Sequence, residues 1–116
     1  MKRDNDTFRK ILLELEAKED WRVLHARTLA PSAEENRFDY HLQLLCDAGF
    51  MAKISESAFR MTNQGHDYLD AIRDDAVWAK TKSGAAAVGG MTLGMLKDLA
   101  VAYLKQETAA KLGIEL

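Results

Sequence analysis

Apolar residues near the start of the chain recur at the spacing of an amphipathic helix. Four of them lie at i, i+3, i+4 and i+7, namely Phe8, Ile11, Leu12 and Leu15. This stripe predicts a first helix over residues 4–18. A second helix is predicted from Ser32 to Gly49. Ser32 and Glu35 match a capping box, and a glycine often follows the end of a helix.

Beyond the second helix, the pattern changes from helical spacing to alternation. Two short alternating runs, residues 50–54 and 58–61, flank a polar turn at residues 55–57. Such a pattern predicts a β-hairpin, which is too small to be stable unless it lies on helices. The stretch around Trp21 and Val23 is the least periodic part of the chain. It fits either a short strand or a segment packed against the core.

The last third of the chain predicts two further helices. Thr62 is expected to cap a long helix that reaches about Lys82. Residues 83–90 contain three glycines and no charged residue, which predicts a flexible connector. Thr92 is expected to cap a last helix, within residues 91–116, that is apolar around most of its circumference. Such a helix needs two neighbours, which we expect to be the domain body and a second copy of the chain.

The order of these parts predicts the fold class. A helix, a hairpin and a further helix are the order in which a winged helix-turn-helix domain places its recognition helix, wing and following helix. We therefore predict an α+β, mostly α protein: a winged helix-turn-helix with a small β-hairpin wing and an extra C-terminal helix. The predicted divisions are a winged-helix domain (residues 1–82), a connector (83–90) and a C-terminal helix (91–116) for dimerisation or packing.

Composition narrows the class of protein. With 116 residues, 47% of them hydrophobic and 29% charged, the chain fits one globular domain. Cys46 is the only cysteine, so one chain cannot form a disulfide, and we expect Cys46 to act as a small buried hydrophobe. The sequence has neither a run of the ~18 apolar residues that a membrane span needs nor a secretory signal, which predicts a cytoplasmic protein without a membrane association.

Polar side chains on the outward face of the second helix suit contact with duplex DNA. A helical wheel buries Phe38, Leu42 and Leu45. The candidate DNA contacts on the helix are Asn36, Arg37, Tyr40 and Gln43. Asn and Gln can hydrogen-bond adenine in the major groove, and Tyr or Arg can contact phosphates. On the wing, Lys53 and Arg60 are the corresponding candidates.

The charge of the same helix argues in the other direction. The chain has a net charge of −2. Four acids between residues 34 and 49 face a single fixed base, Arg37: Glu34, Glu35, Asp39 and Asp47. Phosphate repulsion would oppose such a helix in a DNA groove. A solvated polar face without a ligand and a protein-binding face therefore remain as alternatives to DNA contact.

A homodimer is expected through the C-terminal helix. The candidate interface residues are Trp78, Met95, Leu96, Leu99 and Tyr103. For Trp78 a second interpretation stays open, because a tryptophan near the end of a helix can also cover the core.

No catalytic or metal site is predicted. His66 and Asp70 lie at i, i+4, so they could pair on one helix face. A metal site needs three or four converging ligands, and no second cluster of His or Cys supplies the rest. His41, beside the apolar stripe, is expected to be a packed or hydrogen-bonded histidine. We therefore expect no cofactor and no enzymatic activity.

Several segments together resemble an uncharacterised family of small bacterial and prophage proteins, a domain of unknown function. The resemblance rests on the opening MKRDNDTFRKILLELE, on WRVL, on YHLQLLCDAGF and above all on RMTNQGHDYLDAIRDDAVWAKTK, with GGMTLGMLKDLAVAYLKQ at the end. It spans most of the chain and implies a winged-helix-like fold and an occurrence in mobile elements. It implies no catalytic residue. The short turn of SESAFRM and the alanine-rich connector depart from the family's pattern.

The sequence therefore favours one function narrowly over another. The first is a DNA-binding transcriptional regulator of winged-helix type, associated with a prophage and acting as a dimer on double-stranded DNA. The alternative is a protein–protein interaction module, an adaptor or inhibitor that binds a phage or host protein without binding DNA. The usual role of the fold favours the first, and the acidic helix favours the second.

Overall fold

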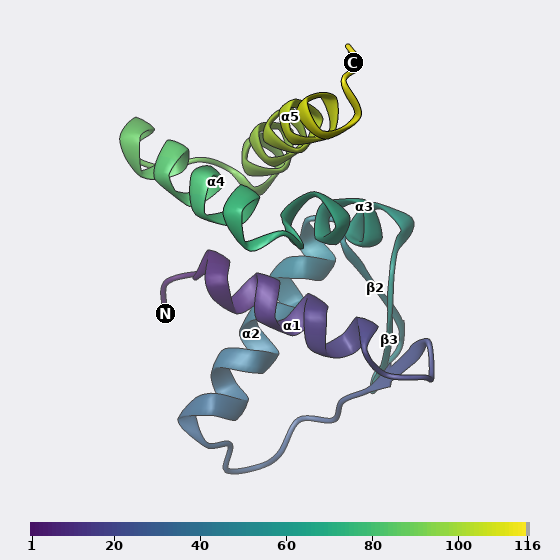
Figure 1. The fold of residues 1–116 in the computed structure, drawn as a ribbon. Helices are drawn as coiled ribbons and strands as arrows, with labels where there is room; N and C mark the ends of the chain where they lie inside the picture. The colour runs from purple at the N-terminus through teal and green to yellow at the C-terminus, as the bar shows by residue number, and fades with distance from the viewer. Residues whose placement is uncertain (116) are drawn as a thin grey trace. The chain divides into compact units, whose positions relative to one another are not determined.

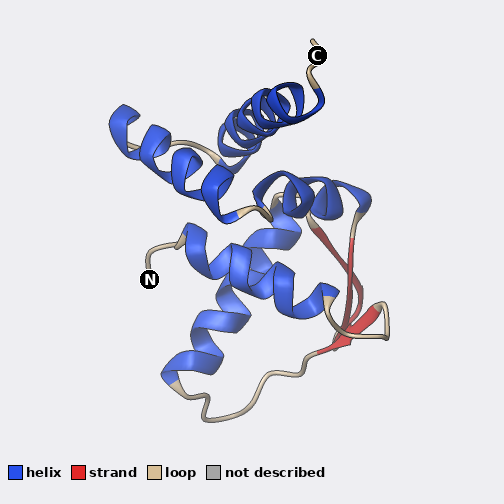
Figure 2. Cartoon of the chain, viewed as in Figure 1, coloured by secondary structure: helices blue, strands red, loops and turns tan. Residues whose placement is uncertain are grey.

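The computed structural model describes residues 1–115, which form five helices and one sheet of three strands (Figures 1 and 2). In chain order these elements are α1 (Asn5–Glu16), β1 (Arg22–Leu24), α2 (Ala33–Asp47), β2 (Met51–Ser55), β3 (Ala58–Met61), α3 (Asn63–Ile72), α4 (Asp75–Val88) and α5 (Leu93–Leu112). The fold is α+β and mostly helical, as predicted. The chain divides into two compact units, Met1–Leu69 and the part from Asp70 onward.

The N-terminal unit packs helices against a small antiparallel sheet. The strand order in the sheet is β1-β3-β2. The predicted hairpin is present as β2 and β3, and the segment near Trp21 forms the third strand of the sheet, β1. Val23 lies opposite Phe59, and both side chains are buried. The unit's largest fully buried side chains come from all three of its helices and from the sheet: Phe8, Leu12, Leu42, Leu45, Met51, Phe59, Tyr68 and Leu69.

The predicted helix signals of this unit are present as local structure. Ser32 and Glu35 form the complete capping box of α2, in which each side chain accepts from the other residue's backbone N–H. Gly49 has a φ of 82°, a left-handed conformation in which a glycine avoids the steric cost of a Cβ. These two features fix both ends of α2.

The segment before α2 differs from a helix-turn-helix. Such a motif joins two helices by a turn of ~3–4 residues. Residues 25–32 instead form an irregular loop between β1 and α2, so no helix of the described chain directly precedes α2. Pro31 disfavours the helical conformation at Ala30, and Arg27 is tied to Asp39 on α2.

The long helix predicted from Thr62 to Lys82 is two helices. α3 ends at Ile72, and Asp74 begins α4 as its N-cap. The Asp74 carboxylate accepts from the backbone N–H groups of Ala76 and Val77 at 2.9 and 3.0 Å. A capping aspartate competes with the continuous helical hydrogen-bond pattern, which accounts for the break.

The prediction of a flexible connector over residues 83–90 is wrong for most of that stretch. α4 continues to Val88, and Gly89, with a φ of 89°, is its C-cap. The alanines at 85–87 are strong helix formers, and Gly84 has a packing role. A Cβ at Gly84 would lie 2.8 Å from Leu99 Cδ2, so the missing side chain lets α5 approach α4 closely. The predicted C-terminal helix begins as expected at the Thr92 cap, whereas Leu116 lies outside the described residues.

Tyr68 provides a first test of this packing. Its ring is stacked on Phe50 at 4.7 Å, and its hydroxyl is buried without a hydrogen-bond partner in the described chain. Tyr68→Phe removes this unpaired group, so we expect the free energy of unfolding to rise by about 1 kcal/mol in urea titrations at pH 7. Tyr40→Phe, at a half-exposed site, is the control and should change little. A lower free energy of unfolding in Tyr68→Phe would contradict the conclusion that the Tyr68 hydroxyl has no hydrogen-bond partner.

The stability of Tyr68→Phe is also expected to depend on pH differently from that of the natural protein. Burial raises the pKa of Tyr68 above its ordinary value of 10.0. The unfolded chain therefore releases a proton near pH 10 that the folded chain retains, so the stability that Tyr68 contributes is full below pH 10 and falls as the pH rises further. We expect Tyr68→Phe to lose less stability than the natural protein between pH 9 and about 11.

Candidate nucleic-acid interface

A buried histidine holds α2 against the first helix. The Asp4 backbone N–H donates to His41 Nε2 at 2.9 Å, and His41 Nδ1 lies 2.8 Å from the Arg37 carbonyl oxygen. Because Nε2 accepts, the ring proton is on Nδ1, which donates to that carbonyl. The ring also meets Phe8 edge-on at 5.0 Å. His41 is 1% exposed, so the predicted packed, hydrogen-bonded histidine is confirmed.

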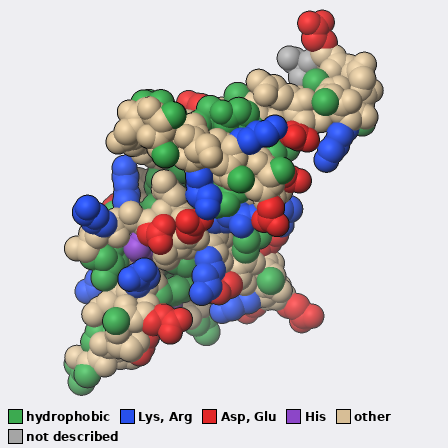
Figure 3. Space-filling view, turned by 60° about the vertical axis from the view of Figure 1, so that its left-hand side comes forward, with side chains coloured by type: hydrophobic (Ala, Val, Ile, Leu, Met, Phe, Trp, Pro, Cys, Tyr) green, Lys and Arg blue, Asp and Glu red, His purple; other side chains and the backbone are tan. Residues whose placement is uncertain are grey.

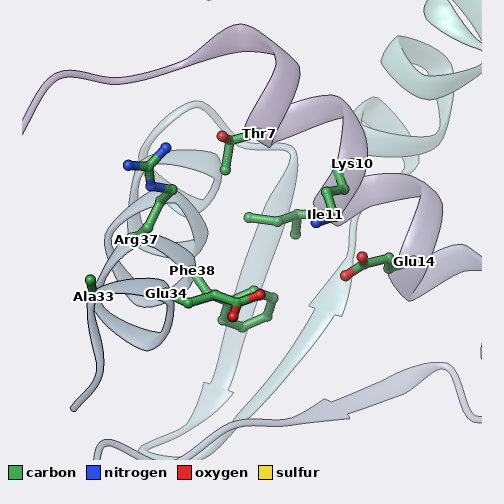
Figure 4. Close-up of a pocket in the computed structure, with 8 residues that line it drawn as sticks. All are labelled: Thr7, Lys10, Ile11, Glu14, Ala33, Glu34, Arg37 and Phe38. Atoms are coloured by element: carbon green, nitrogen blue, oxygen red, sulfur yellow. The ribbon is translucent and has the colours of Figure 1, made fainter.

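One flank of α2 forms a groove with α1. Its volume is about 440 Å³, and Figure 4 shows side chains of both helices facing it. The lining residues are Thr7, Lys10, Ile11 and Glu14 from α1 and Ala33, Glu34, Arg37 and Phe38 from α2. Arg37 thus borders this groove, across from Lys10. Two bases and two acids line the groove, which leaves it without a net charge.

The other flank of α2 is tied to the loop of residues 25–32. Asp39 pairs with His25 Nε2 at 3.3 Å and with Arg27 Nε at 3.2 Å. Glu35 accepts from the Thr28 hydroxyl at 3.3 Å in addition to closing the capping box. Two of the four acids that count against DNA binding therefore already have partners in the chain. Asn36 borders the hollow of about 320 Å³ on this side.

The four predicted contact residues of α2 share a feature. Within residues 1–115 their side chains form neither hydrogen bonds nor ion pairs: Asn36, Arg37, Tyr40 and Gln43. Asn36 and Arg37 are exposed, Tyr40 is 39% exposed and Gln43 is half-buried. Their donors and acceptors are therefore available to a ligand. They do not form one compact cluster, because Asn36 and Arg37 border hollows on opposite flanks of the helix.

The two predicted wing residues lie on different faces of the sheet. Lys53 is the register partner of Phe59, so it belongs to the face on which Phe59 is buried, although Lys53 itself is exposed at the sheet edge. It also lies 3.7 Å from Glu56. Arg60 points to the opposite face, where its partner is Arg22 on β1. Sequence analysis missed Arg22, because only the register of β1 on β3 brings the two arginines together.

The residues predicted for a dimer interface are mostly used inside the chain. Trp78 and Leu96 are 4% and 1% exposed. A Cβ at Gly84 would lie 3.4 Å from the Tyr103 hydroxyl and closer still to Leu99, so these two side chains pack beside α4. Met95 is the most exposed of the five, at 48%. The continuation of α4 to Val88 supplies one of the two neighbours that the prediction gives the last helix. Dimerisation itself stays a prediction.

The groups considered for chemistry are occupied with other contacts. His66 lies 3.7 Å from Glu16, and Asp70 pairs with Arg73 at 3.0 Å, so these two residues have other partners than each other. No three His, Cys, Asp or Glu side chains among residues 1–115 are grouped so as to hold a metal ion. Burial raises the pKa of the half-buried Cys46 thiol, which favours its unreactive protonated form.

The charge on the face drawn in Figure 3 is mixed. Figure 3 shows Lys and Arg side chains interspersed with Asp and Glu over this face of the molecule, without a continuous basic band. None of the helices in the described chain has both the length and the apolar composition needed to cross a bilayer.

Comparison with known proteins places the chain in a family. The model of a family described as "Hypothetical protein (DUF2513)" matches residues 2–92 and so stops directly before α5. An uncharacterised protein of Haemophilus influenzae is 31% identical over 118 residues, covering 94% of this chain and 100% of that protein. No solved structure matches the chain. The resemblance noted from the sequence is confirmed, and the chain belongs to the DUF2513 family of hypothetical proteins.

Proposed function

We propose that this protein binds double-stranded DNA as a winged-helix type regulator, with α2 in the major groove and the β2–β3 hairpin beside the phosphate backbone. The observation that carries the proposal is the set of polar side chains on α2 that have no hydrogen-bond or ion-pair partner among residues 1–115. Asn36 and Gln43 have amides without partners in the described chain, and amide side chains are the groups that read adenine. Arg37 and Tyr40 supply groups suited to phosphate.

The arrangement around α2 supports this role. α2 is followed directly by a hairpin, and its buried side, which includes Leu42 and Leu45, is fixed to the unit. The helix is therefore presented on a rigid scaffold. The winged-helix interpretation rests on this order of elements and on the β1-β3-β2 sheet. The irregular loop at residues 25–32 takes the place in which a helix-turn-helix has its first helix.

The local charge is less unfavourable than the sequence indicates. Asp39 forms an ion pair with Arg27 and a side-chain contact with His25, and Glu35 serves as a capping group. Glu34 and Asp47 remain exposed without compensation by such pairs. We therefore expect the protein to bind DNA of arbitrary sequence with modest affinity. Most of its affinity for a preferred sequence should come from contacts with the bases.

Binding of the full-length protein to fluorescently labelled duplex DNA tests the proposal. The duplexes carry either a random sequence or the region upstream of its own gene, at 50 to about 200 mM salt. Gln43→Ala should weaken binding to the preferred sequence by about 1–3 kcal/mol and leave the salt slope unchanged. Arg37→Ala should reduce the slope by about one. Gln64→Ala, an exposed glutamine of α3, is the matched control. Absence of binding at 50 mM salt would contradict the proposal.

One observation favours the alternative function, a protein-binding module. The mixed surface in Figure 3 lacks the continuous basic stripe that a DNA-binding protein commonly presents. Under this alternative the α2 face and the groove beside it contact a protein, and the same titration separates the two functions. If α2 binds a protein partner, the natural protein should not bind DNA in the titration. Arg37→Ala should then weaken binding of the protein partner.

A further inference from the structure

Two arginines face each other on the exposed side of the sheet. Arg22 on β1 and Arg60 on β3 are direct partners in the antiparallel register. Side chains of such partners project from the same face, with Cβ atoms ~4.5–5.5 Å apart. Val23 and Phe59, next to them, are buried on the opposite face, so both arginines project away from the core. The register therefore places two arginine side chains on one exposed face of the sheet.

This juxtaposition is unfavourable in the chain alone, because like charges directly opposite each other destabilise a sheet. Arg60 forms neither an ion pair nor a hydrogen bond through its side chain within the described residues. Arg22 pairs with Asp20 at 3.2 Å, and the backbone N–H and guanidinium of Arg22 lower the pKa of that carboxyl. Both members of that pair are more than half exposed, so the pair contributes little.

The surroundings suit a ligand with both charge and apolar surface. Trp21 is 66% exposed, and the Arg22 guanidinium carbon lies 5.6 Å from its ring centroid. Leu24, at the next position of the same strand face, is 79% exposed. Two arginines and an aliphatic side chain thus share one side of the sheet, and an aromatic ring contacts the guanidinium of one arginine.

We propose that Arg22 and Arg60 together bind one phosphate of the DNA backbone on the exposed face of the sheet, with Trp21 beside the adjoining sugar. A guanidinium fork donates two parallel hydrogen bonds to phosphate oxygens, and two forks in register can share one phosphate. This inference rests on the proposed function and adds a contact surface to it. An acidic peptide would offer carboxylates to the same forks, and the experiment distinguishes it.

The test uses the same chain, the DNA titration above, four variants of the two arginines and one control variant. Arg22→Ala and Arg60→Ala should each weaken binding about tenfold. The double variant should lose less than the product of the two single losses, and the salt slope should fall by about one, because only one phosphate is involved. Arg22→Lys retains the charge without the fork, so it should recover the slope but only part of the affinity. Lys111→Ala, an exposed cation of α5, is the control.

Thermal unfolding of the same variants separates a ligand role from a structural one. Removal of either arginine should leave the melting temperature unchanged or higher, because a like-charge pair is relieved. A lower melting temperature in both single variants would overturn the inference.

Each result of the titration either supports or contradicts a phosphate site shared by Arg22 and Arg60. Unchanged affinity and slope in the double variant, with Gln43→Ala still weakened, would overturn this inference and leave the proposed function standing. Multiplicative losses with a slope change of about two would indicate two separate phosphates and overturn the shared site. Binding of polyglutamate through the arginines, with DNA binding unaffected, would assign the surface to an acidic protein. Absence of DNA binding by the natural protein would remove both proposals.

Discussion

Gly65→Ala is expected to lower the free energy of unfolding by about 4 kcal/mol, a large share of the stability of a domain this size. A Cβ at Gly65 would lie far inside contact distance of the Phe50 backbone carbonyl oxygen and 2.8 Å from Met61 Cγ. The methionine side chain can move, whereas the carbonyl accepts a hydrogen bond from the Thr62 backbone N–H at 3.1 Å and is fixed. Relief therefore requires α3 to move away from the end of α2.

The cap of α3 makes such a movement costly. The Thr62 hydroxyl donates to the Gly49 carbonyl and accepts from the Gly65 N–H at 3.0 Å. The Thr-x-x-Gly segment thus links three pieces of backbone: the end of α2, the start of β2 and the start of α3. A displacement of α3 large enough to admit a methyl group would break several of these bonds at once.

Gly94→Ala is the matched control for this prediction. Gly94 also lies in a helix, α5, but the nearest atom to a Cβ there, other than the excluded neighbours, is Thr92 Oγ1 at 4.0 Å. Because alanine stabilises an unobstructed helix, Gly94→Ala should raise stability by about 0.5–1 kcal/mol. Urea unfolding followed by circular dichroism measures both variants. Equal midpoints for Gly65→Ala and the natural protein would show that α3 does not pack against Phe50 in this way.

His41→Ala is expected to cost about 3 kcal/mol. The substitution removes a fully buried ring that packs on Phe8 and leaves a cavity between α1 and α2. It also removes the acceptor of the Asp4 backbone N–H, a donor at the very start of α1. Asp4 is the N-cap of that helix, so the loss should extend into its first turn.

Two measurements separate this effect from general loss of packing. Hydrogen exchange should accelerate at the Asp4 amide in His41→Ala more than at the Leu12 amide, which lies deeper in α1. His66→Ala, at an exposed position, removes the same side chain type and should change stability by less than about 0.5 kcal/mol. If both histidine variants unfold at the same urea concentration, the hydrogen bond between Asp4 and His41 does not contribute to the free energy of unfolding.

The elements that sequence predicts well are those whose signals are local. The capping box of Ser32 and Glu35, the glycine after α2 and the alternation of the hairpin each depend on a few neighbouring residues. The break at Asp74 is also local, but an aspartate competes there with a strong helical pattern, and the pattern alone predicts a continuous helix. The prediction for residues 83–88 is wrong because a glycine such as Gly84 usually ends a helix. Its role in α4 depends on the close contact with Leu99 of α5, which the local sequence does not show.

The features that sequence could not predict depend on contacts between distant residues. The partner of His41 is the backbone of Asp4, and the partner of Arg60 is Arg22. The loop of residues 25–32 neutralises Asp39, whereas a count along α2 treats that acid as free. The candidate interface can therefore be predicted only in part from the sequence. The helical pattern identifies the polar residues of α2 that lack partners, whereas it assigns Lys53 and Arg60 to one surface. The strand register places these two residues on different faces of the sheet.

The strand order β1-β3-β2 has a consequence for the synthesis of the protein. β1 is made early, yet its neighbour in the sheet is β3, the last strand to leave the ribosome. Val23 therefore cannot be buried against Phe59 until almost the whole N-terminal unit has emerged. Contacts so far apart in sequence form late, because the chain between them must first be ordered. The amino-terminal strand is thus among the first parts of the protein to be synthesised, yet it cannot take its place in the sheet until β3 has emerged.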